Sequence, residues 1–387
     1  MQLLVLDKNF KAIDTLDDYE SLIWTDRYCG YGDFEIYTLA NVSILNTVLV
    51  DYYIWSDESE HVMIVESREI ETDSENGHHL RITGRSLESI LDRRIVWDQT
   101  ILNGDIEGQL KRLLEKNIIN PDNDQRKIPN FVFQWSKNPE IEEITIRRQF
   151  TGTTLYDAIT DICSTLHLGY KITLNDQDQF VFQLYSGTDR SYKQETLPYV
   201  IFSPNFENLL ESNYLESKSS WKNVALVAGE GEGHERKKVT TGLPYMIGLE
   251  RRELFVDARD IQSTYSYEND DGEYVEEELP KAEYDEQLKQ RGDSYLSDVK
   301  EIKTFDGEAD PDGTFQYGKD YFIGDICQIE NEYELQARVR VVEFVYSESL
   351  EGIKMYPTFA MADDSEDENK DKDEDEDKDS NKDEEVS

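Results

Sequence analysis

Short alternating runs of apolar and polar residues fill the first hundred positions and predict an all-β unit. Six runs rich in β-branched and aromatic residues are separated by turn-forming residues, as strands are. They are Gln2–Leu6, Leu22–Trp24, Asp33–Thr38, Thr47–Trp55, Val62–Thr72 and Leu80–Thr83. Asn76-Gly77 favours a tight hairpin turn before the last run, because both residues tolerate positive φ. Six short strands indicate a barrel or a sandwich.

The period of the pattern changes within Leu80–Trp97. The alternation stops at Gly84, and Ser86 can cap a short helix whose apolar edge is Leu87, Ile90 and Leu91. Arg93-Arg94 closes this helix, and a strand-like run, Ile95–Trp97, follows. The two arginines have two interpretations. They are solvated cations that favour the negative end of the helix, or they pair with carboxylates across a subunit contact.

Residues 101–215 have the pattern of an α/β unit. Ile106–Asn117 is helical in period, Asn120–Asn130 indicates a loop, and Tyr170–Leu174 and Phe180–Tyr185 indicate strands. A second helix begins at the capping residue Thr154 and ends at Gly169. Its apolar stripe is Leu155, Ala158, Ile159, Ile162, Cys163 and Leu166, which places Cys163 in a core.

The pattern returns to strands in the last third of the chain. The predicted strands are Leu209–Ser217, Asn223–Gly229, Lys237–Thr241, Tyr321–Ile326, Leu335–Tyr346 and Lys354–Phe359. Between them lie Leu249–Val256 of mixed pattern, an acidic, tyrosine-rich insertion over Tyr265–Leu279 and a helix over Pro280–Leu296 that Gly292 interrupts. Asp310-Pro311-Asp312-Gly313 predicts a turn.

These patterns predict a mainly β fold with α+β insertions. We expect a first β-barrel over residues 1–100, an α/β insertion over 101–215 and a second β-barrel over 216–360. The second barrel carries a helical and acidic insertion at about 257–312, and the strands at 216–241 belong either to it or to the first barrel. Residues 361–387 contain almost no apolar side chain, so we expect a disordered acidic tail.

Charge narrows the set of possible partners. The net charge is −44, and residues 363–387, with 15 acidic and 4 basic residues, carry 11 of these charges, so residues 1–362 are strongly acidic too. Specific binding of duplex DNA needs cations on the protein that displace the counterions around the phosphates, and this acidic surface lacks them. The same negative charge repels an anionic membrane. Such a surface suits DNA that slides past without adhering, or a basic partner.

The sequence indicates a soluble protein that is made and assembled in a cytoplasm. The start, Met1–Asp7, lacks the basic lead-in of a secretion signal, and no window approaches the ~18 apolar residues of a membrane span. We therefore expect no membrane insertion by this chain. Cys29, Cys163 and Cys327 are widely spaced and odd in number, so they predict buried free thiols rather than disulfides or a zinc site.

Candidate chemistry is sparse. The glycines of Gly229–Gly233 do not have GxGxxG spacing, and the glutamates between them repel phosphate, so a hairpin loop is expected. Neighbouring His78 and His79 point to opposite faces of a strand, which disfavours a metal site with Asp73 or Glu75. Arg291-Gly292-Asp293 is a chance cell-adhesion tripeptide, and His167 is a cation near a helix end. We predict a non-enzymatic protein without catalytic, cofactor-binding or metal-binding residues.

Several segments, taken in order, resemble one family. They are Tyr31–Ile36, Ile82–Leu87 with Leu91–Val96, the glycine loop after the valine-rich strand at Asn223–Gly233, Asp320–Asp325, and Arg338–Val341 to Pro357–Phe359. Together they look like the baseplate hub, or tail-hub, proteins of long-tailed siphophages, over most of residues 1–360. The order of the segments carries this resemblance, because no single motif is diagnostic.

The resemblance implies a structural protein of the virion. It implies a homotrimer whose two β-barrel tube domains per subunit form a pseudo-sixfold ring that continues the tail tube. It also implies attachment to the distal tail protein and the tape measure protein, and to tip or receptor-binding components. DNA would pass through the ring without specific binding. Some relatives carry a C-terminal peptidoglycan-cleaving or adhesin domain, and here the acidic tail stands in its place.

Two other classes fit parts of the pattern. An acidic surface-binding protein or adhesin predicts a monomer and a secretion route. A glycan hydrolase with an active site of distant carboxylates predicts release of glycan by the purified protein. For the hub, we hypothesise that part of the negative charge lines the channel, because the chain is acidic without basic patches.

Overall fold

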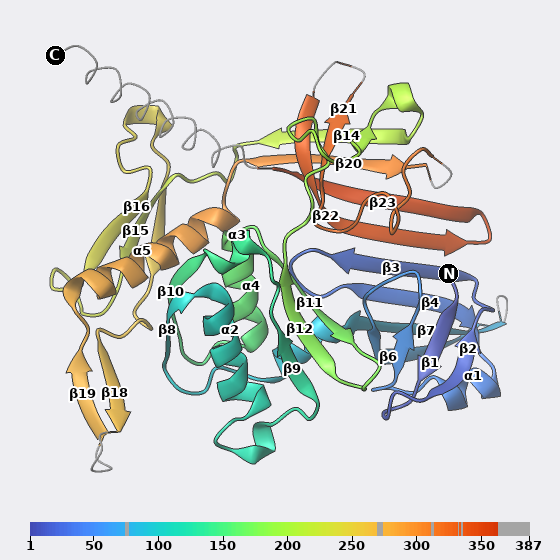
Figure 1. Cartoon of the computed structure of the whole chain (residues 1–387), viewed down its shortest axis with the longest axis horizontal. Coiled ribbons are helices and arrows are strands. Elements are labelled where there is room, and N and C mark those ends of the chain that lie inside the picture. Colours follow the sequence, from blue (N-terminus) through green and yellow to red (C-terminus); the bar gives the residue numbers. More distant parts are fainter. Residues whose placement is uncertain (74–76, 269–273, 311–312, 332, 334–335, 363–387) are drawn as a thin grey trace.

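One long sheet built from both ends of the chain dominates the fold (Figure 1). The computed structural model describes residues 1–73, 77–268, 274–310, 313–331, 333 and 336–362. In this part the sheet has 13 strands and follows the path β14-β20-β23-β22-β3-β4-β7-β6-β5-β1-β2, with β21 and β13 branching from β22. The strands are β1 (Leu3–Leu6), β2 (Ala12–Leu16), β3 (Ser21–Arg27), β4 (Asp33–Leu39), β5 (Tyr53–Trp55), β6 (Met63–Asp73), β7 (Gly77–Ser86), β13 (Ile201–Phe202), β14 (Leu209–Ser217), β20 (Ile302–Ala309), β21 (Ile326–Glu330), β22 (Gln336–Ser349) and β23 (Gly352–Met361).

The pairing of β3 with β22 joins the two predicted β regions. In this antiparallel pair Trp24 lies opposite Tyr346, and one hydrophobic core beneath the sheet takes side chains from both regions, including Phe34 and Phe359. The mainly β class is therefore confirmed. The prediction of two barrels is corrected to one open sheet, because the path of described strands starts at β14 and stops at β2 without closing. Sequence patterns report the faces of a strand and not its partner, so this junction was beyond them.

The predicted strand Thr47–Trp55 is wrong in its first part. The chain forms helix α1 (Val42–Thr47), and only Tyr53–Trp55 is a strand. The Asn41 side chain accepts a hydrogen bond from the Ile44 amide and so caps this helix. The β-branched run that follows outweighed this cap in the sequence pattern.

The turn from β7 into the next element was predicted in outline. A 3₁₀ helix, η1 (Leu87–Arg93), follows the strand and buries the predicted residues Leu87, Ile90 and Leu91. Ser86 does not cap it: its Oγ accepts from the Gly32 amide and donates to Glu88 instead. Ile95–Trp97 is not a strand but contributes one bridge, between Ile95 and Thr154.

Gly84 permits a close approach of two strands. A Cβ at this position would lie 1.8 Å from the carbonyl oxygen of Ile64 on β6. The register of β6 against β7 shifts between Val65 and Ser67, as it does at a β-bulge. The glycine therefore marks a bulge that bends the sheet above η1.

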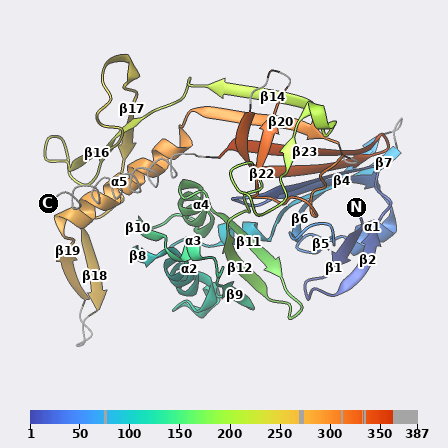
Figure 2. The ribbon, with the colours of Figure 1, turned by 45° about the horizontal axis from the view of Figure 1, so that its top comes forward.

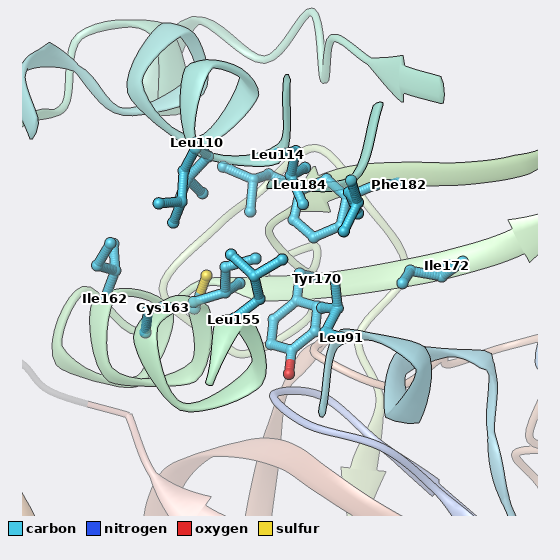
Figure 3. Close-up of a cluster of buried hydrophobic side chains, with 14 of the residues drawn as sticks. Leu91, Leu110, Leu114, Leu155, Ile162, Cys163, Tyr170, Ile172, Phe182 and Leu184 are labelled. Atoms are coloured by element: carbon cyan, nitrogen blue, oxygen red, sulfur yellow. The ribbon is translucent and has the colours of Figure 1, made fainter. Parts of the chain in front are cut away.

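The α/β unit packs against η1 around its own core. Its elements are β8 (Thr100–Asp105), α2 (Ile106–Leu114), the π-helix η2 (Glu115–Ile119), the 3₁₀ turn η3 (Asp124–Arg126), β9 (Phe131–Gln134), α3 (Pro139–Glu142), β10 (Thr145–Phe150), α4 (Leu155–Thr165), β11 (Gly169–Leu174) and β12 (Phe180–Tyr185). Figure 3 shows Cys163 of α4 facing a core that includes Tyr170 and Phe182. The Thr154 side chain accepts from the Asp157 amide, as the predicted cap requires.

A smaller unit lies on the opposite side of the α/β unit from β1 and β2 (Figure 2). Its three-stranded sheet has β15 (Val224–Ala228) between β16 (Lys238–Gly242) and β17 (Glu253–Asp257), and helix α5 (Lys281–Asp298) packs on it. The hairpin of β18 (Thr264–Glu268) and β19 (Tyr274–Glu278) projects beside α5, and the short turns η4 (Pro204–Phe206) and η5 (Gly248–Glu250) complete the fold. α5 continues through Gly292, contrary to the prediction. A Cβ at Gly292 would lie 2.5 Å from the side chains of Thr241 and Val227. The glycine lets the helix approach the sheet.

Most other predicted strands are confirmed within a few residues. The predicted strand Tyr321–Ile326 is wrong, because β21 begins only at Ile326 and Tyr321 contributes a single bridge to Tyr317. Asn76, Pro311 and Asp312 of the predicted turns, and the tail beyond residue 362, lie outside the described residues.

Candidate assembly surfaces

The long sheet ends in two strands with one neighbour each. Among the described residues β2 pairs with β1 alone, and β14 pairs with β20 alone. An edge strand presents unpaired amide and carbonyl groups to any strand that approaches it. These two edges are therefore the first candidate surfaces for assembly.

The β14 edge exposes apolar side chains on both faces. Tyr214 and Leu215 are neighbours, so their side chains point to opposite faces, yet they are 38% and 46% exposed. Leu210, near the start of the strand, is 56% exposed. A strand that covered only a core would bury one of its two faces. β14 thus extends beyond the core and has the features of an interface.

The central strands carry a charged face opposite the core. We call the "charged face" the ion-paired carboxylates and arginines on the outward side of β3, β4, β7, β6 and the part of β22 that pairs with β3, Glu343–Ser349. Its carboxylates are Asp33, Glu35, Glu66, Glu69, Glu71 and Glu343, and its arginines are Arg27, Arg81 and Arg85. Arg27 contacts carboxylates of two strands, because its Nη1 lies 2.5 Å from Asp33 and its Nε 2.6 Å from Glu343. Six carboxylates against three arginines leave this face net negative.

A buried polar network ties the long sheet to the α/β unit. Glu88, on η1, is fully buried, and its Oε1 accepts from the Ile172 amide of β11 at 2.7 Å. Its Oε2 accepts from Ser86 Oγ at 2.5 Å. His61 is also buried, and its Nδ1 lies 3.2 Å from Glu88 Oε1. Among the described residues His61 Nδ1 has no hydrogen-bond partner, so the attraction between opposite charges dominates this pair.

Asp26 extends the network toward the C-terminal strands. It is 3% exposed and accepts hydrogen bonds from Trp24 Nε1, Ser59 Oγ and Tyr317 OH at 3.0 to 3.3 Å. Burial raises the pKa of Asp26. Burial alone would lower the pKa of His61 and raise that of Glu88, but their mutual attraction outweighs it, so the pKa of Glu88 is lowered and that of His61 rises to about 9.

The His61 shift predicts a loss of stability in mild alkali. Below the unfolded pKa of about 6.5 the histidine is charged in both states, and its contribution is fully present. Between about pH 6.5 and 9 only the folded state keeps the proton, so the free energy of unfolding should fall by about 1.4 kcal/mol per pH unit. Urea unfolding at pH 6.5, 7.5 and 8.5 measures this slope. The variant His61→Gln should be less stable at pH 6.5 and should lose the slope, and an unchanged slope would show that His61 is not charged.

The predicted arginine pair divides between two roles. Arg94 Nε donates to the Arg126 carbonyl at 2.9 Å, and its Nη1 donates to the Arg93 carbonyl at 2.8 Å, so its guanidinium is held within the subunit. Arg93 is exposed at the end of η1. Pairing of Arg93 or Arg94 with a neighbouring subunit stays a prediction, and Arg93 is the better placed of the two.

The other residues that the sequence analysis considered as possible binding sites have structural roles. His79 is 3.3 Å from Glu20 and stacks on Tyr37, and Gly229–Gly233 lies in the connection of the antiparallel pair β15 and β16, as expected. The Arg291-Gly292-Asp293 tripeptide lies inside α5, where Arg291 pairs with Asp260 and Asp293 accepts from Thr241. Helical geometry and these contacts leave no loop for an adhesion partner to bind.

The cysteines are free thiols. Cys163 and Cys327 are buried, and Cys29 is partly buried, where burial raises the pKa of its thiol to about 12. In the part of the chain that the structure describes, no three His, Cys, Asp or Glu side chains gather in a way that could hold a metal ion. No helix there combines the length and apolar character that a membrane crossing requires.

Solved structures share this fold along nearly the whole chain. The tail protein from Neisseria meningitidis MC58 is 15% identical, with a TM-score of 0.53 over 92% of this chain and 95% of its own. The 43 kDa tail protein of prophage MuSo2 from Shewanella oneidensis is 12% identical, with a TM-score of 0.56 over 93% and 98%. The arrangement of strands and helices described above is therefore a phage tail-protein fold.

Residues 2–359 match the model of a siphovirus family described as Siphovirus ReqiPepy6 Gp37-like protein, and the chain belongs to this family. No curated protein matches it. Family and fold together confirm the resemblance to siphophage tail proteins and place the chain among the components of the virion.

Proposed function

We propose that this chain is the hub of a siphophage baseplate. Three copies form a pseudo-sixfold ring that closes or continues the tail tube, and the ring leaves a channel for DNA ejection. The observation that carries this proposal is the long sheet with two unpaired edges and one charged face. Family membership and the tail-protein fold make a ring of this kind the best account of both features.

The two edges support closure between copies. Unpaired edges invite uncontrolled association, and cyclic symmetry removes that hazard by burying the edge of one copy against the next. Ile13 on β2 and Leu215 on β14 are 40% and 46% exposed, so each edge offers apolar area to a neighbour. Each subunit contributes two strand-rich halves joined at β3 and β22, which gives six in a trimer.

The charged face supports a channel wall. It is continuous across the β3 and β22 junction, because the pair Arg27 and Glu343 links the two halves. Its net negative charge would repel the phosphates of passing DNA and keep the duplex from adhering. The core lies on the other side of the same strands, so a ring that turned this face inward would keep the core intact.

The hub proposal also implies a set of partner proteins and a structural rather than an enzymatic role. The ring would bind the distal tail protein and the tape measure protein, and tip or receptor-binding components would attach to it. The role is structural, because the buried ionisable groups are engaged in packing: Glu88 and Asp26 accept from neighbouring parts of the fold rather than opening into a cleft.

A charge placed on the β14 edge should prevent ring formation. The variant Leu215→Lys puts an ammonium group at the proposed contact and should weaken association by about 10- to 100-fold, or ~1.4 to 3 kcal/mol. Sedimentation of the full chain, alone and with the distal tail protein of its phage, measures the effect. The unchanged chain should reach three times the 45.1 kDa mass of one copy.

The matched control is Leu350→Lys. Leu350 is 90% exposed at the tip of the β22 and β23 hairpin, so it tests whether any added lysine disturbs assembly. If Leu215→Lys forms trimers as well as Leu350→Lys does, β14 does not lie in the interface between copies.

A further inference from the structure

Strands β14 and β23 release the chain at the same end of the long sheet. Both are antiparallel to β20, so they run in the same direction. Thr304 of β20 lies opposite Leu215 on one side and opposite Ala360 on the other. Lys218 comes three positions after Leu215, and Ala362, the last described residue, comes two positions after Ala360. Two strand spacings separate the two exits, which is about 10 Å.

A cationic cluster stands at the exit of β14. We define it as Lys218 and Arg252, whose cations lie beside the Trp221 ring, together with Lys222, the residue that follows Trp221 in the chain. Lys218 Nζ lies 5.3 Å and the Arg252 guanidinium carbon 5.2 Å from the centre of the Trp221 ring. The Arg252 Nη1 donates to the Lys218 carbonyl at 2.5 Å, and the Lys222 amide donates to the Val299 carbonyl at 3.0 Å. Side-chain contacts thus hold Lys218 and Arg252 at the ring, and a backbone hydrogen bond holds Lys222.

The cluster has more positive charge than its surroundings neutralise. Lys218 lies 3.3 Å from Glu301, the one carboxylate paired with the cluster in the described part of the chain. The adjacent Arg251 differs, because its Nε is 2.6 Å from Glu253. Among the described residues neither Lys222 nor Arg252 has a carboxylate partner, so the cluster carries positive charge that an anionic segment can neutralise.

We propose that residues 363–387 of the same subunit dock on this cationic cluster. The segment holds 15 acidic and 4 basic residues and begins directly after Ala362, whose amide donates to the Arg338 carbonyl. The segment opens with Asp363 and Asp364 in the sequence, and the end of β23 from which it continues lies about 10 Å from the end of β14 by the strand spacing. A connection this short gives a high effective concentration, so several weak ion pairs suffice to hold the segment. This docking goes beyond the hub role and does not require the ring.

The docked segment would cover a basic surface until assembly. Its sequence has many equivalent carboxylates, so the contact is electrostatic and exchanges among registers rather than forming one fixed structure. An acidic surface on another tail component would compete for the same cations. The segment would thereby limit premature binding of anions to the small unit that carries β15 and α5.

Zero-length cross-linking of the full chain tests this docking. A carbodiimide joins carboxylates to lysines in direct contact, and mass spectrometry identifies the linked residues. We expect links from residues 363–387 to Lys218 and Lys222, and about fivefold fewer in 0.5 M salt, where screening shortens the reach of charge. Exposed Lys127 and Lys319 are the reference lysines.

Two variants define the site. Arg252→Gln should lower the yield of links to Lys218 and Lys222, whereas Arg251→Gln should leave it unchanged. A chain whose 15 acidic tail residues are replaced by Asn and Gln cannot form tail links, and it should show heightened binding of a synthetic peptide of residues 363–387 to the freed cluster. This second variant leaves residues 1–362 unaltered and keeps the test valid if Arg252→Gln does not fold.

Three results would overturn the proposal. Links spread over Lys127 and Lys319 as often as over the cluster would mean no docking site. Yields that do not depend on salt would mean that charge does not drive the contact. In a mixture of isotopically heavy and light chains, links found only between chains would mean that the segment binds a second copy and not its own subunit.

Discussion

Replacing Glu88 by alanine is expected to lower the free energy of unfolding by about 3 to 5 kcal/mol. Removing the carboxylate leaves the buried His61 ring without the charge that stabilises its proton, and the Ile172 amide and Ser86 hydroxyl lose their acceptor. Breaking a buried pair and leaving buried donors without an acceptor costs more than losing a surface pair, because no water replaces the missing oxygen atoms.

Chemical unfolding followed by circular dichroism at pH 6.5 measures the loss in Glu88→Ala. The control is Lys8→Ala, which breaks the exposed pair of Lys8 and Asp51 and should change stability by less than about 1 kcal/mol. The double variant with His61→Leu should recover part of the stability lost in Glu88→Ala, since an apolar side chain then replaces the buried imidazole that has lost its partner. Equal stability of Glu88→Ala and the unchanged chain would mean that the network does not hold the α/β unit to the sheet.

Replacing Trp24 by alanine should cost about 3 to 5 kcal/mol. Trp24 is 1% exposed, lies opposite Tyr346 in the β3 and β22 pair and packs on Phe34. Its indole also donates to Asp26 at 3.0 Å, so the alanine variant both leaves a cavity and removes a donor from a buried carboxylate.

The variant Trp24→Phe separates these two contributions. It keeps most of the packing and loses the hydrogen bond, so its cost should be about 1 to 3 kcal/mol. Because the two halves share one sheet and one core, hydrogen exchange should show β4 and β23 losing protection together in Trp24→Ala. Loss of protection in β4 alone would contradict a common core.

The sequence predicted most strands because their faces differ. Alternating runs such as Asp33–Thr38 have one buried and one polar face, and the alternation of apolar and polar residues in the sequence shows this difference directly. The helix at Leu155–Thr165 was predicted for a similar reason, since cap and stripe agree. The error at Thr47–Trp55 arose where cap and propensity disagreed, and the cap at Asn41 decided the first turn.

The long-range features were beyond the sequence. Strands β3 and β22 are more than 300 residues apart, and nothing in either one names its partner. The polar network was missed for the same reason, because Asp26, His61 and Glu88 come from three separate segments and share no spacing. Family resemblance supplied what periodicity could not, namely that the two β regions belong to one tail protein.

The sequence predicted the net negative charge but not the position of the charged face. Acidity without basic patches suggested a channel lining, and the structure places six of the carboxylates on one face of the central strands. The cationic cluster at Lys218, Lys222 and Arg252 is the exception to the predicted lack of basic patches. Its members are spread over 35 positions and meet only because β15 and β17 are paired in parallel.

Cryo-electron microscopy of the full chain assembled with the distal tail protein of its phage tests the hub account most directly. We predict three copies around an open channel, with β2 and β14 at the contacts between copies and the side chains of Glu35, Glu69 and Glu343 on the channel wall. Copies that enclose no channel, or a channel whose wall is neutral or basic, would contradict the account.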